Sequence, residues 1–315
     1  MSRQLSVTQR LVIAELHKRG YECRPMDSLS PKVFLEFTDG QGRRRYINGA
    51  VGDKTNAVAC RIVDDKLATT SIAQQLGLRA PDTVCYESIE QAQEFIGRHG
   101  TVVVKPLDSA HGNGVTVQVD SPEKLAQAVS RAQQFCEVVL LQQQVGGQDM
   151  RLLYIGGEFC AAAERRPAAV IGDGQHTIHE LIELENEKPE RGQNYQTKYN
   201  VIPLATAAVY LGDRITGVPA AGELVQVIGT ANIGSGGVAV DRTEEVPEGL
   251  IAQGKRLVDE LALGVCGVDF LDGPEGSYII EANASPSFGL HHYPHEGAPH
   301  DVTAAFVDWI LETEA

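Results

Sequence analysis

The feature that most constrains the fold is a pair of apolar segments near the C-terminus. Val265–Leu271 (VCGVDFL) and Tyr278–Asn283 (YIIEAN) are separated by an acidic turn that contains glycine and proline. This pattern predicts two neighbouring strands joined by a short connection. Side chains two residues apart on a strand share a face, so Glu281 and Asn283 project together, and Asp269 on the neighbouring strand can converge with them.

The chemistry of these three side chains suggests a metal site. Two carboxylates and an amide oxygen are hard ligands, suited to Mg²⁺ bound between protein and phosphates, with Mn²⁺ as an alternative ion. Asp269, Glu281 and Asn283 are therefore predicted metal ligands. The alternative is that the carboxylates lie on a solvated strand face. Their apolar neighbours argue against it, but spacing alone leaves both interpretations open.

The rest of the chain mixes helical and strand patterns, which predicts an α+β fold. A compact strand-loop-strand-helix-strand unit is expected between residues 101 and 142, whereas residues 187–222 give no clear pattern. Helices are expected at 7–19, 64–76, 88–98, 121–135, 178–186, 247–263 and 302–311. Strands are expected at 33–37, 44–48, 101–105, 115–119, 138–142, 150–155, 158–165, 224–228, 265–271 and 277–282.

A lysine followed by a glycine-bearing loop is a second chemical signal. Lys105 ends an apolar strand, and Gly112 and Gly114 follow in VVVKPLDSAHGNGVTV. The lysine can contact phosphate as a point charge. The glycines let backbone N–H groups approach phosphate oxygens closely. Taken alone, the segment is better explained as a hairpin turn.

A third signal is the passage from an apolar strand to a polar hinge in LLQQQVGGQDMR. Asp149 and Arg151 share one face of the strand that follows. An aspartate can accept the ribose hydroxyls of a nucleotide, and an arginine can bind phosphate or carboxylate with two hydrogen bonds. The alternative is a surface ion pair, which contributes little.

Two further segments give weaker signals. Thr230–Arg242 (TANIGSGGVAVDR) is rich in small residues whose N–H groups can hold an anionic substrate or an oxyanion, but taken alone the segment is better explained as a flexible surface loop. His291, His292 and His295 form an HHxxH run. No carboxylate or cysteine completes a zinc site nearby in the sequence, so substrate contact or a plain polar loop is the preferred interpretation.

Composition limits the classes of protein to consider. Hydrophobic residues make up 43% and charged residues 22% of the 315 residues, which is typical of a globular protein. The net charge of −15 argues against a nucleic-acid partner, because phosphates repel an acidic surface. No apolar run approaches membrane-spanning length and the N-terminus lacks a signal-peptide pattern, so no membrane partner and a cytoplasmic location are expected. The six cysteines contain no CxxC pair and are expected to be free thiols.

As a set, five segments from about residue 50 onward resemble the ATP-grasp superfamily. Within it they are similar to the ATP-grasp module shared by cyanophycin synthetases and bifunctional glutathione synthetases. The segments are NGAVGDKTNAVACRIVDDK, VVVKPLDSAHGNGV, GQDMRLLYIGGEFCAAAERRPAAVIGDGQHTIHELI, TANIGSGGVAVDRTEEVP and VCGVDFLDGPEGSYIIEANASPSFGLHHYPHEG. The opening VTQRLVIAELHKRGYECRPMD and the HHYPHEG run look closer to the glutathione synthetase type.

The resemblance implies an ATP-grasp fold with the active site between a mobile lid and a larger antiparallel sheet. The expected parts are a short N-terminal subdomain (1–65), the lid (66–146) and the C-terminal subdomain (147–315). ATP would contact Lys66, Lys105, His111, Gly112, Asn113, Gly114, Gln142, Gln143, Val145 and Asp149. The catalytic set would be Arg151, Arg165, Asn232, Gly236 and Gly237, the metal ligands Asp269, Glu281 and Asn283, and the substrate contacts Arg166, Ser285, Ser287 and His292.

The implied activity is an ATP-dependent ligation of a carboxylate and an amine through an acyl-phosphate, on an amino acid or acidic peptide. The alternatives are a cyanophycin synthetase-like amino-acid ligase and a catalytically inactive ATP-binding accessory protein. A homo-oligomer is also expected. Gln142 replaces the glutamate usual in such hinges, and Asn113 replaces a basic residue common in the loop, which puts one adenine contact and one phosphate contact in doubt.

Overall fold

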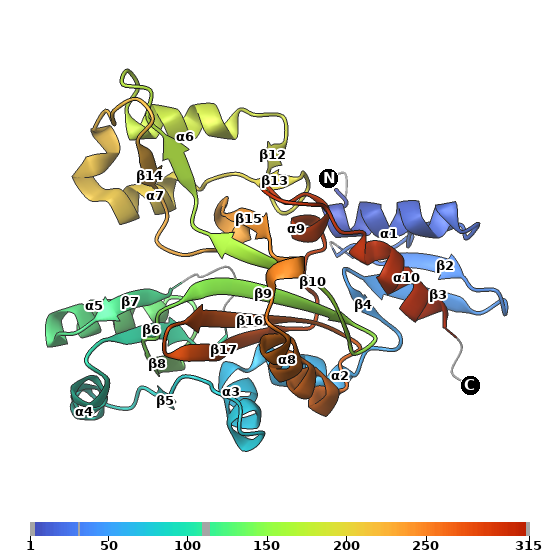
Figure 1. Ribbon diagram of the computed structural model, residues 1–315, viewed down its shortest axis with the longest axis horizontal. Coiled ribbons are helices and arrows are strands. Elements are labelled where there is room, and N and C mark those ends of the chain that lie inside the picture. The colour runs from blue at the N-terminus through green and yellow to red at the C-terminus, as the bar shows by residue number, and fades with distance from the viewer. Residues whose placement is uncertain (1–3, 31, 109–113, 313–315) are drawn as a thin grey trace.

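A five-stranded antiparallel sheet forms the centre of the protein in the computed structural model (Figure 1), which describes residues 4–30, 32–108 and 114–312. Its strand order is β15-β10-β9-β16-β17. Helix α8 (Glu248–Leu261) packs on β9 and β10, and the Tyr154 hydroxyl donates to the Ile251 carbonyl over 2.8 Å. The strands are β9 (Gln148–Ile155), β10 (Glu158–Arg166), β15 (Val238–Asp241), β16 (Val265–Gly273) and β17 (Gly276–Asn283).

The register of this sheet aligns charged residues in one row. Arg151 on β9 lies opposite Asp269 on β16, and Asp269 lies opposite Glu281 on β17. Residues directly opposite one another in a sheet point to the same face, so the three side chains share one surface. The pairing of β16 with β17 confirms the predicted strand pair.

A second sheet of four strands, in the order β5-β8-β6-β7, lies beside the first in Figure 1. It comprises β5 (Thr83–Cys85), β6 (Val102–Pro106), β7 (Thr116–Val119) and β8 (Val139–Gln143), with helices α4 (Ile89–His99) and α5 (Pro122–Ala132). Ser121 caps α5 by accepting from the Lys124 amide, and Pro122 takes the first helical position, as predicted. Phe95, Val104 and Leu125 belong to a separate core under this sheet.

The N-terminal part forms its own four-stranded sheet against helices α1 (Val7–Lys18) and α10 (Val302–Leu311). Its strands are β1 (Cys23–Pro25), β2 (Leu35–Thr38), β3 (Arg44–Asn48) and β4 (Val51–Gly52). The predicted helices 7–19 and 302–311 and the hairpin of β2 and β3 are confirmed within one or two residues at each end.

Two consecutive helices occupy residues 57–75: the second confirms the helix predicted over residues 64–76 within two residues at each end, and the first was not predicted. They are α2 (Ala57–Asp64) and α3 (Lys66–Gln75). Asp65 between them has extended backbone, and its side chain caps α3 by accepting from the Leu67 and Ala68 amides. Both helices pack on β17.

An insertion between β10 and β15 occupies residues 169–228 and carries a small core of its own around Ile182 and Val227. It contains β11 (Ala169–Ile171), α6 (Ile178–Asn186), β12 (Arg191–Gly192), β13 (Tyr199–Asn200), α7 (Leu204–Leu211), η1 (Gly212–Thr216) and β14 (Leu224–Gln226). The remaining short elements are η2 (Ile233–Ser235), η3 (Thr243–Glu245) and α9 (Gly289–His292). None of the helices in the described parts of the chain is long and apolar enough to cross a membrane.

Candidate active site

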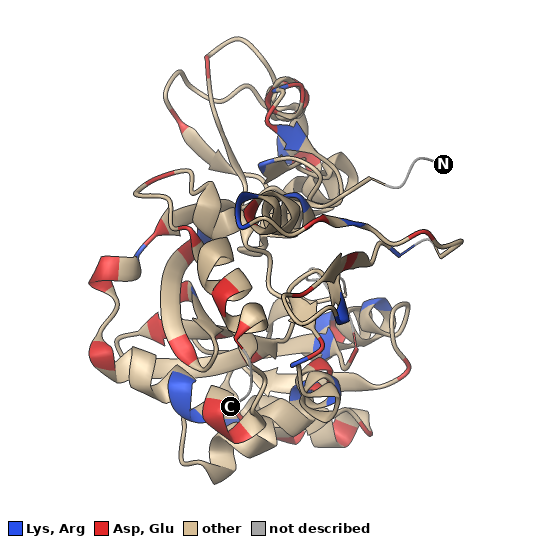
Figure 2. Cartoon of the chain, turned by 90° about the vertical axis from the view of Figure 1, so that its right-hand side faces the viewer, with Lys and Arg blue, Asp and Glu red and all other residues tan. Residues whose placement is uncertain are grey.

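A cavity of about 650 Å³ is lined by residues of both large sheets and by the N-terminal part. The excess of acidic residues in the chain is spread over many helices and loops of the face in Figure 2, whereas four basic side chains converge in the cavity. The predicted site residues that line it are Lys66, Lys105, Gln142, Gln143, Val145, Asp149, Arg151, Arg165, Asn232, Asp269, Glu281, Asn283, Ser285 and Ser287. Residues that the sequence pattern placed in five separate segments thus meet at one site.

The pair of Arg151 and Asp269 lies at the floor of this cavity. Asp269 is 3% exposed and Arg151 8% exposed. Arg151 donates to both carboxylate oxygens of Asp269, over 2.7 Å from Nη2 to Oδ2. Gly267 lets the arginine lie across β16, because a Cβ there would stand 2.9 Å from Arg151 Cδ and 3.0 Å from Pro286 Cβ. The glycine is therefore a condition of this geometry.

Arg165 extends the pair into a network with two carboxylates. Its Nη2 lies 2.6 Å from Asp149 Oδ1 and 2.9 Å from Asp269 Oδ2. Burial acts to raise the pKa of the Asp269 carboxyl, but the charges of Arg151 and Arg165 outweigh burial and hold this pKa below its ordinary value. Burial raises the pKa of Asp149 to about 6, against the opposing effect of Arg165. Oδ1 of Asp149, the predicted ribose contact, is thus already paired with Arg165.

Lys105 faces this row from the other sheet. Its ammonium group donates to Gln142 Oε1 over 2.9 Å, and Gln142 Nε2 donates to Thr83 Oγ1 over 2.8 Å. Burial lowers the pKa of Lys105 to about 8, partly offset by the charge of Glu281. A neutral amide at position 142 orients the lysine without neutralising it, which gives the substitution of the usual glutamate a local structural role. Lys66 reaches the same region and donates to the Leu107 carbonyl over 3.1 Å.

The residues predicted to hold a metal fit a hard divalent cation. Within the described ranges, the Glu281 carboxylate makes no hydrogen bond or ion pair, although it lines the cavity next to the paired Asp269. Asn283 Oδ1 accepts from the Ser285 amide over 2.8 Å, which fixes the orientation of its side chain. The described part of the chain holds no group of three or more His, Cys, Asp or Glu side chains suited to a metal. The predicted ligands are two carboxylates and one amide, which leaves room for phosphate oxygens to complete the coordination of the ion.

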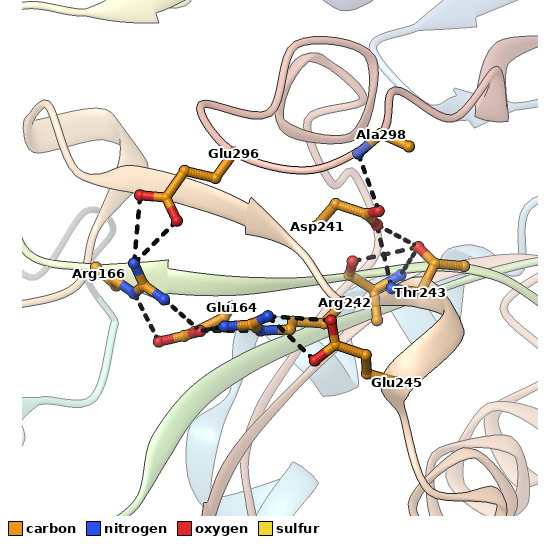
Figure 3. A network of polar contacts seen from close by, with 9 residues as sticks. Glu164, Arg166, Asp241, Arg242, Thr243, Glu245, Glu296 and Ala298 are labelled. Atoms are coloured by element: carbon orange, nitrogen blue, oxygen red, sulfur yellow. Dashed lines mark hydrogen bonds and ion pairs between the residues drawn. The ribbon is translucent and has the colours of Figure 1, made fainter.

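Several predicted site residues do not line the cavity. The side chain of Arg166 pairs with Glu164 over 2.8 Å and with Glu296 over 3.3 Å, in a network that Arg242 joins (Figure 3). His292 Nε2 lies 2.7 Å from Thr303 Oγ1, outside the cavity lining. The substrate contacts predicted for these two residues therefore have no support from their position.

The predicted glycines have structural roles near the cavity. A Cβ on Gly236 would lie 2.7 Å from Ile202, and one on Gly237 would lie 2.7 Å from the Asn232 carbonyl, so both allow the tight turn that presents Asn232. Gly114 has a left-handed backbone and packs against Phe135 and Pro106. The remaining residues of the predicted phosphate loop, His111, Gly112 and Asn113, lie outside the described residues.

The HHxxH run is divided among three environments. His291 is fully buried, and burial lowers its pKa to about 3. His292 contacts Thr303. His295 stacks on Tyr199 with ring centroids 3.9 Å apart and accepts from the Ala239 amide over 3.2 Å.

Residues that the sequence pattern did not single out complete the cavity wall. They are Ser6 and Thr8 at the start of α1, Gly49 beside β3, and Asn194 and Tyr195 in the insertion. The Gly49–Ala50 turn is tied to the site because the Ala50 amide donates to Ser285 Oγ over 3.2 Å. Polar residues in loops carry no periodic signal, and only the fold brings these segments to one place.

Comparison with known proteins identifies the class. Residues 65–178 match the family described as the ATP-grasp domain of prokaryotic glutathione synthetase. The fold is the expected α+β ATP-grasp fold, with a cavity between a smaller sheet and a larger antiparallel one.

Similarities over nearly the whole chain indicate which ATP-grasp proteins are its relatives. The chain is 32% identical over 328 residues to a cyanophycin synthetase of Trichormus variabilis, covering 98% of this chain and 35% of that protein. It is 28% identical over 309 residues to a bifunctional glutathione biosynthesis protein of Clostridium perfringens, covering 93% and 39%. The structure of a bifunctional glutathione synthetase from Pasteurella multocida matches with a TM-score of 0.68 and 25% identity, covering 96% and 43%.

The chain is therefore an ATP-grasp protein related to the ATP-grasp regions of cyanophycin synthetases and bifunctional glutathione synthetases. It spans 35% to 43% of the length of the relatives named above.

Proposed function

We propose that this chain is an ATP-dependent carboxylate–amine ligase that forms an amide or peptide bond through an acyl-phosphate. The observation that carries the proposal is the row of Arg151, Asp269 and Glu281 across three strands, which faces the buried Lys105 across one cavity. This row supplies oxygen ligands and fixed positive charge where a transferred phosphoryl group would lie.

The nucleotide end of the cavity is assigned to the second sheet and the hinge that follows it. Lys66 and Lys105 would contact the phosphates, and Gln142, Gln143 and Val145 would line the adenine site. The predicted covering loop, His111 to Gly114, belongs to the same assignment. Asp149 keeps its predicted place at the ribose through Oδ2, since Oδ1 is used by Arg165.

The metal assignment is Asp269, Glu281 and Asn283, with Mg²⁺ as the proposed ion and Mn²⁺ as its substitute. When bound, the ion would supply positive charge that neutralises phosphate oxygens during transfer. Glu281 is the available ligand, whereas Asp269 is shared with the arginines.

The reaction would proceed in two steps. An oxygen of the substrate carboxylate attacks the γ-phosphorus of ATP, and ADP leaves. The amine then attacks the acyl carbon and phosphate leaves. Arg151, Arg165 and Lys105 would offset the charge that accumulates on the phosphoryl oxygens, because hydrogen bonds and ion pairs hold them at fixed positions. Asn232 and the turn that bears it would hold the acyl group beside these residues.

The substrate class proposed is an amino acid or a small peptide. The support is that the relatives named above are called cyanophycin synthetases and glutathione biosynthesis proteins. Ser285 and Ser287 line the cavity and are the proposed substrate contacts. A cytoplasmic location and assembly into a homo-oligomer belong to the proposal. The competing function, an inactive ATP-binding accessory protein, is disfavoured because most of the predicted charged residues, including Asp269, Glu281 and Lys105, line one cavity.

The test is ADP release on a panel of carboxylate donors, including γ-glutamylcysteine and aspartyl peptides, each with glycine and other amino acids. Turnover that requires both a carboxylate and an amine, and that is lost in Glu281→Ala, is the expected result. ATP binding without turnover on any pair would favour the accessory protein.

A further inference from the structure

Two consecutive residues in the insertion have an unusual backbone at the cavity wall. Asn194 and Tyr195 have φ angles of 55° and 57°. Asparagine tolerates this left-handed conformation, but a bulky residue such as tyrosine seldom adopts it. Such a conformation persists only where the surroundings enforce it, and it is concentrated at ligand-binding sites. Both residues line the cavity.

The segment is fixed from two sides. The Val7 amide donates to the Tyr195 carbonyl over 2.7 Å, and the Tyr195 amide donates to Asn200 Oδ1 over 2.8 Å. Further along, Tyr199 stacks on His295 at 3.9 Å. The main chain at Tyr195 is thus held by hydrogen bonds with α1 and β13 before any substrate binds.

Tyr195 lines the cavity near enough to Arg151 and Arg165 for their charges to act on its hydroxyl. Tyr195 is half-buried, and burial raises the pKa of its hydroxyl, while the charges of Arg151 and Arg165 act in the opposite direction. The hydroxyl therefore remains a hydrogen-bond donor near neutral pH. The hinge residues Gln142 and Gln143 end β8 of the second sheet and Val145 follows it, whereas Tyr195 belongs to the insertion, with a hydrogen bond to α1.

We propose that Tyr195 is a substrate-binding residue whose hydroxyl donates a hydrogen bond to the carboxylate of the acyl-donor substrate, beside Arg151 and Arg165. The ligand class is the carboxylate of an amino acid or peptide. This assignment rests on the proposed ligase function and adds to it a specificity residue from the insertion. Hydrogen bonds with Val7 and Asn200 hold the main chain at Tyr195 in place.

The test is steady-state ADP release by Tyr195→Phe, with Tyr199→Phe as the matched control from the same segment. Both variants lose one hydroxyl and keep the ring. In Tyr195→Phe, kcat/KM for the carboxylate substrate should fall at least about tenfold, since a hydrogen bond to a charged group is lost. The KM for ATP should stay within about twofold, and Tyr199→Phe should match wild type.

The outcomes separate this inference from the proposed function. If wild type turns over and Tyr195→Phe shows unchanged kinetics for the carboxylate, the inference is wrong and the ligase function stands. A Tyr195→Phe protein that no longer shows a thermal shift with ATP would mean that the hydroxyl has a structural role, which also overturns the inference. If wild type turns over no carboxylate–amine pair, the proposed function fails and the inference fails with it.

Discussion

Asp269 and Glu281 are predicted to differ in their effect on stability although both are assigned to the metal. In Asp269→Asn, the buried guanidinium of Arg151 loses its carboxylate partner, and Arg165 loses one of two. Removing one partner of a buried ion pair costs about 3–5 kcal/mol. Glu281 makes no ion pair within the described ranges, so Glu281→Gln should change the free energy of unfolding by about 1 kcal/mol or less.

The assay is urea unfolding of both variants and wild type without nucleotide or divalent ions. Each substitution replaces a carboxylate by its amide, so side-chain size is matched. Both variants should lose ligase activity, but only Asp269→Asn should lower the free energy of unfolding by about 3–5 kcal/mol. Equal stabilities for the two variants would refute the claim that Asp269 anchors the arginines as well as serving the metal.

Three further predictions follow from the site and the core. Burial lowers the pKa of Lys105 to about 8, and bound phosphates favour the charged lysine, so ATP affinity should weaken as pH rises through that value. Fluorescent-nucleotide titration of wild type and Lys105→Arg measures the affinity, and an unchanged wild-type affinity from pH 7 to 9.5 would contradict the prediction. Gly267→Ala should displace Arg151 and lower kcat/KM about tenfold or more while the KM for ATP changes little; wild-type kinetics would show that the arginine adapts. Burial raises the pKa of Cys23 to about 11 and the pKa of Cys266 to about 12. Mass spectrometry after iodoacetamide treatment at pH 8 should therefore find both thiols unmodified until denaturant is added. Labelling of Cys266 in the native protein would show that β16 is not buried in the core.

The regular elements of the fold were largely predictable because their signals are local. The strand pair of β16 and β17, the capped helix α5 and the hairpin of β2 and β3 follow from apolar periodicity, caps and glycine turns. Helix α2 was missed, because its eight residues give only a short apolar pattern and its packing on β17 is not visible in the sequence.

From residue patterns alone, without the family resemblance, the cavity residues were best predicted where charged residues interrupt apolar strands. Asp269, Glu281 and Lys105 stand out in this way, and the structure brings them to one cavity. The part contributed by Tyr195 was not predictable, because a left-handed conformation in an irregular loop depends on contacts with α1 and β13. Arg166 was predicted as a site residue but does not line the cavity. Its neighbour Arg165 does, whereas the side chain of Arg166 pairs with Glu164 and Glu296.

The central claim, ligation through an acyl-phosphate, is tested most directly by isotope transfer. The active donor of the panel is prepared with ¹⁸O in its carboxylate, and the phosphate released during turnover with the amine is analysed by mass spectrometry. The account predicts one ¹⁸O in each phosphate, because the carboxylate oxygen that attacks the γ-phosphorus leaves with it. Amide formation with unlabelled phosphate, or release of ADP that needs no carboxylate, would contradict the account.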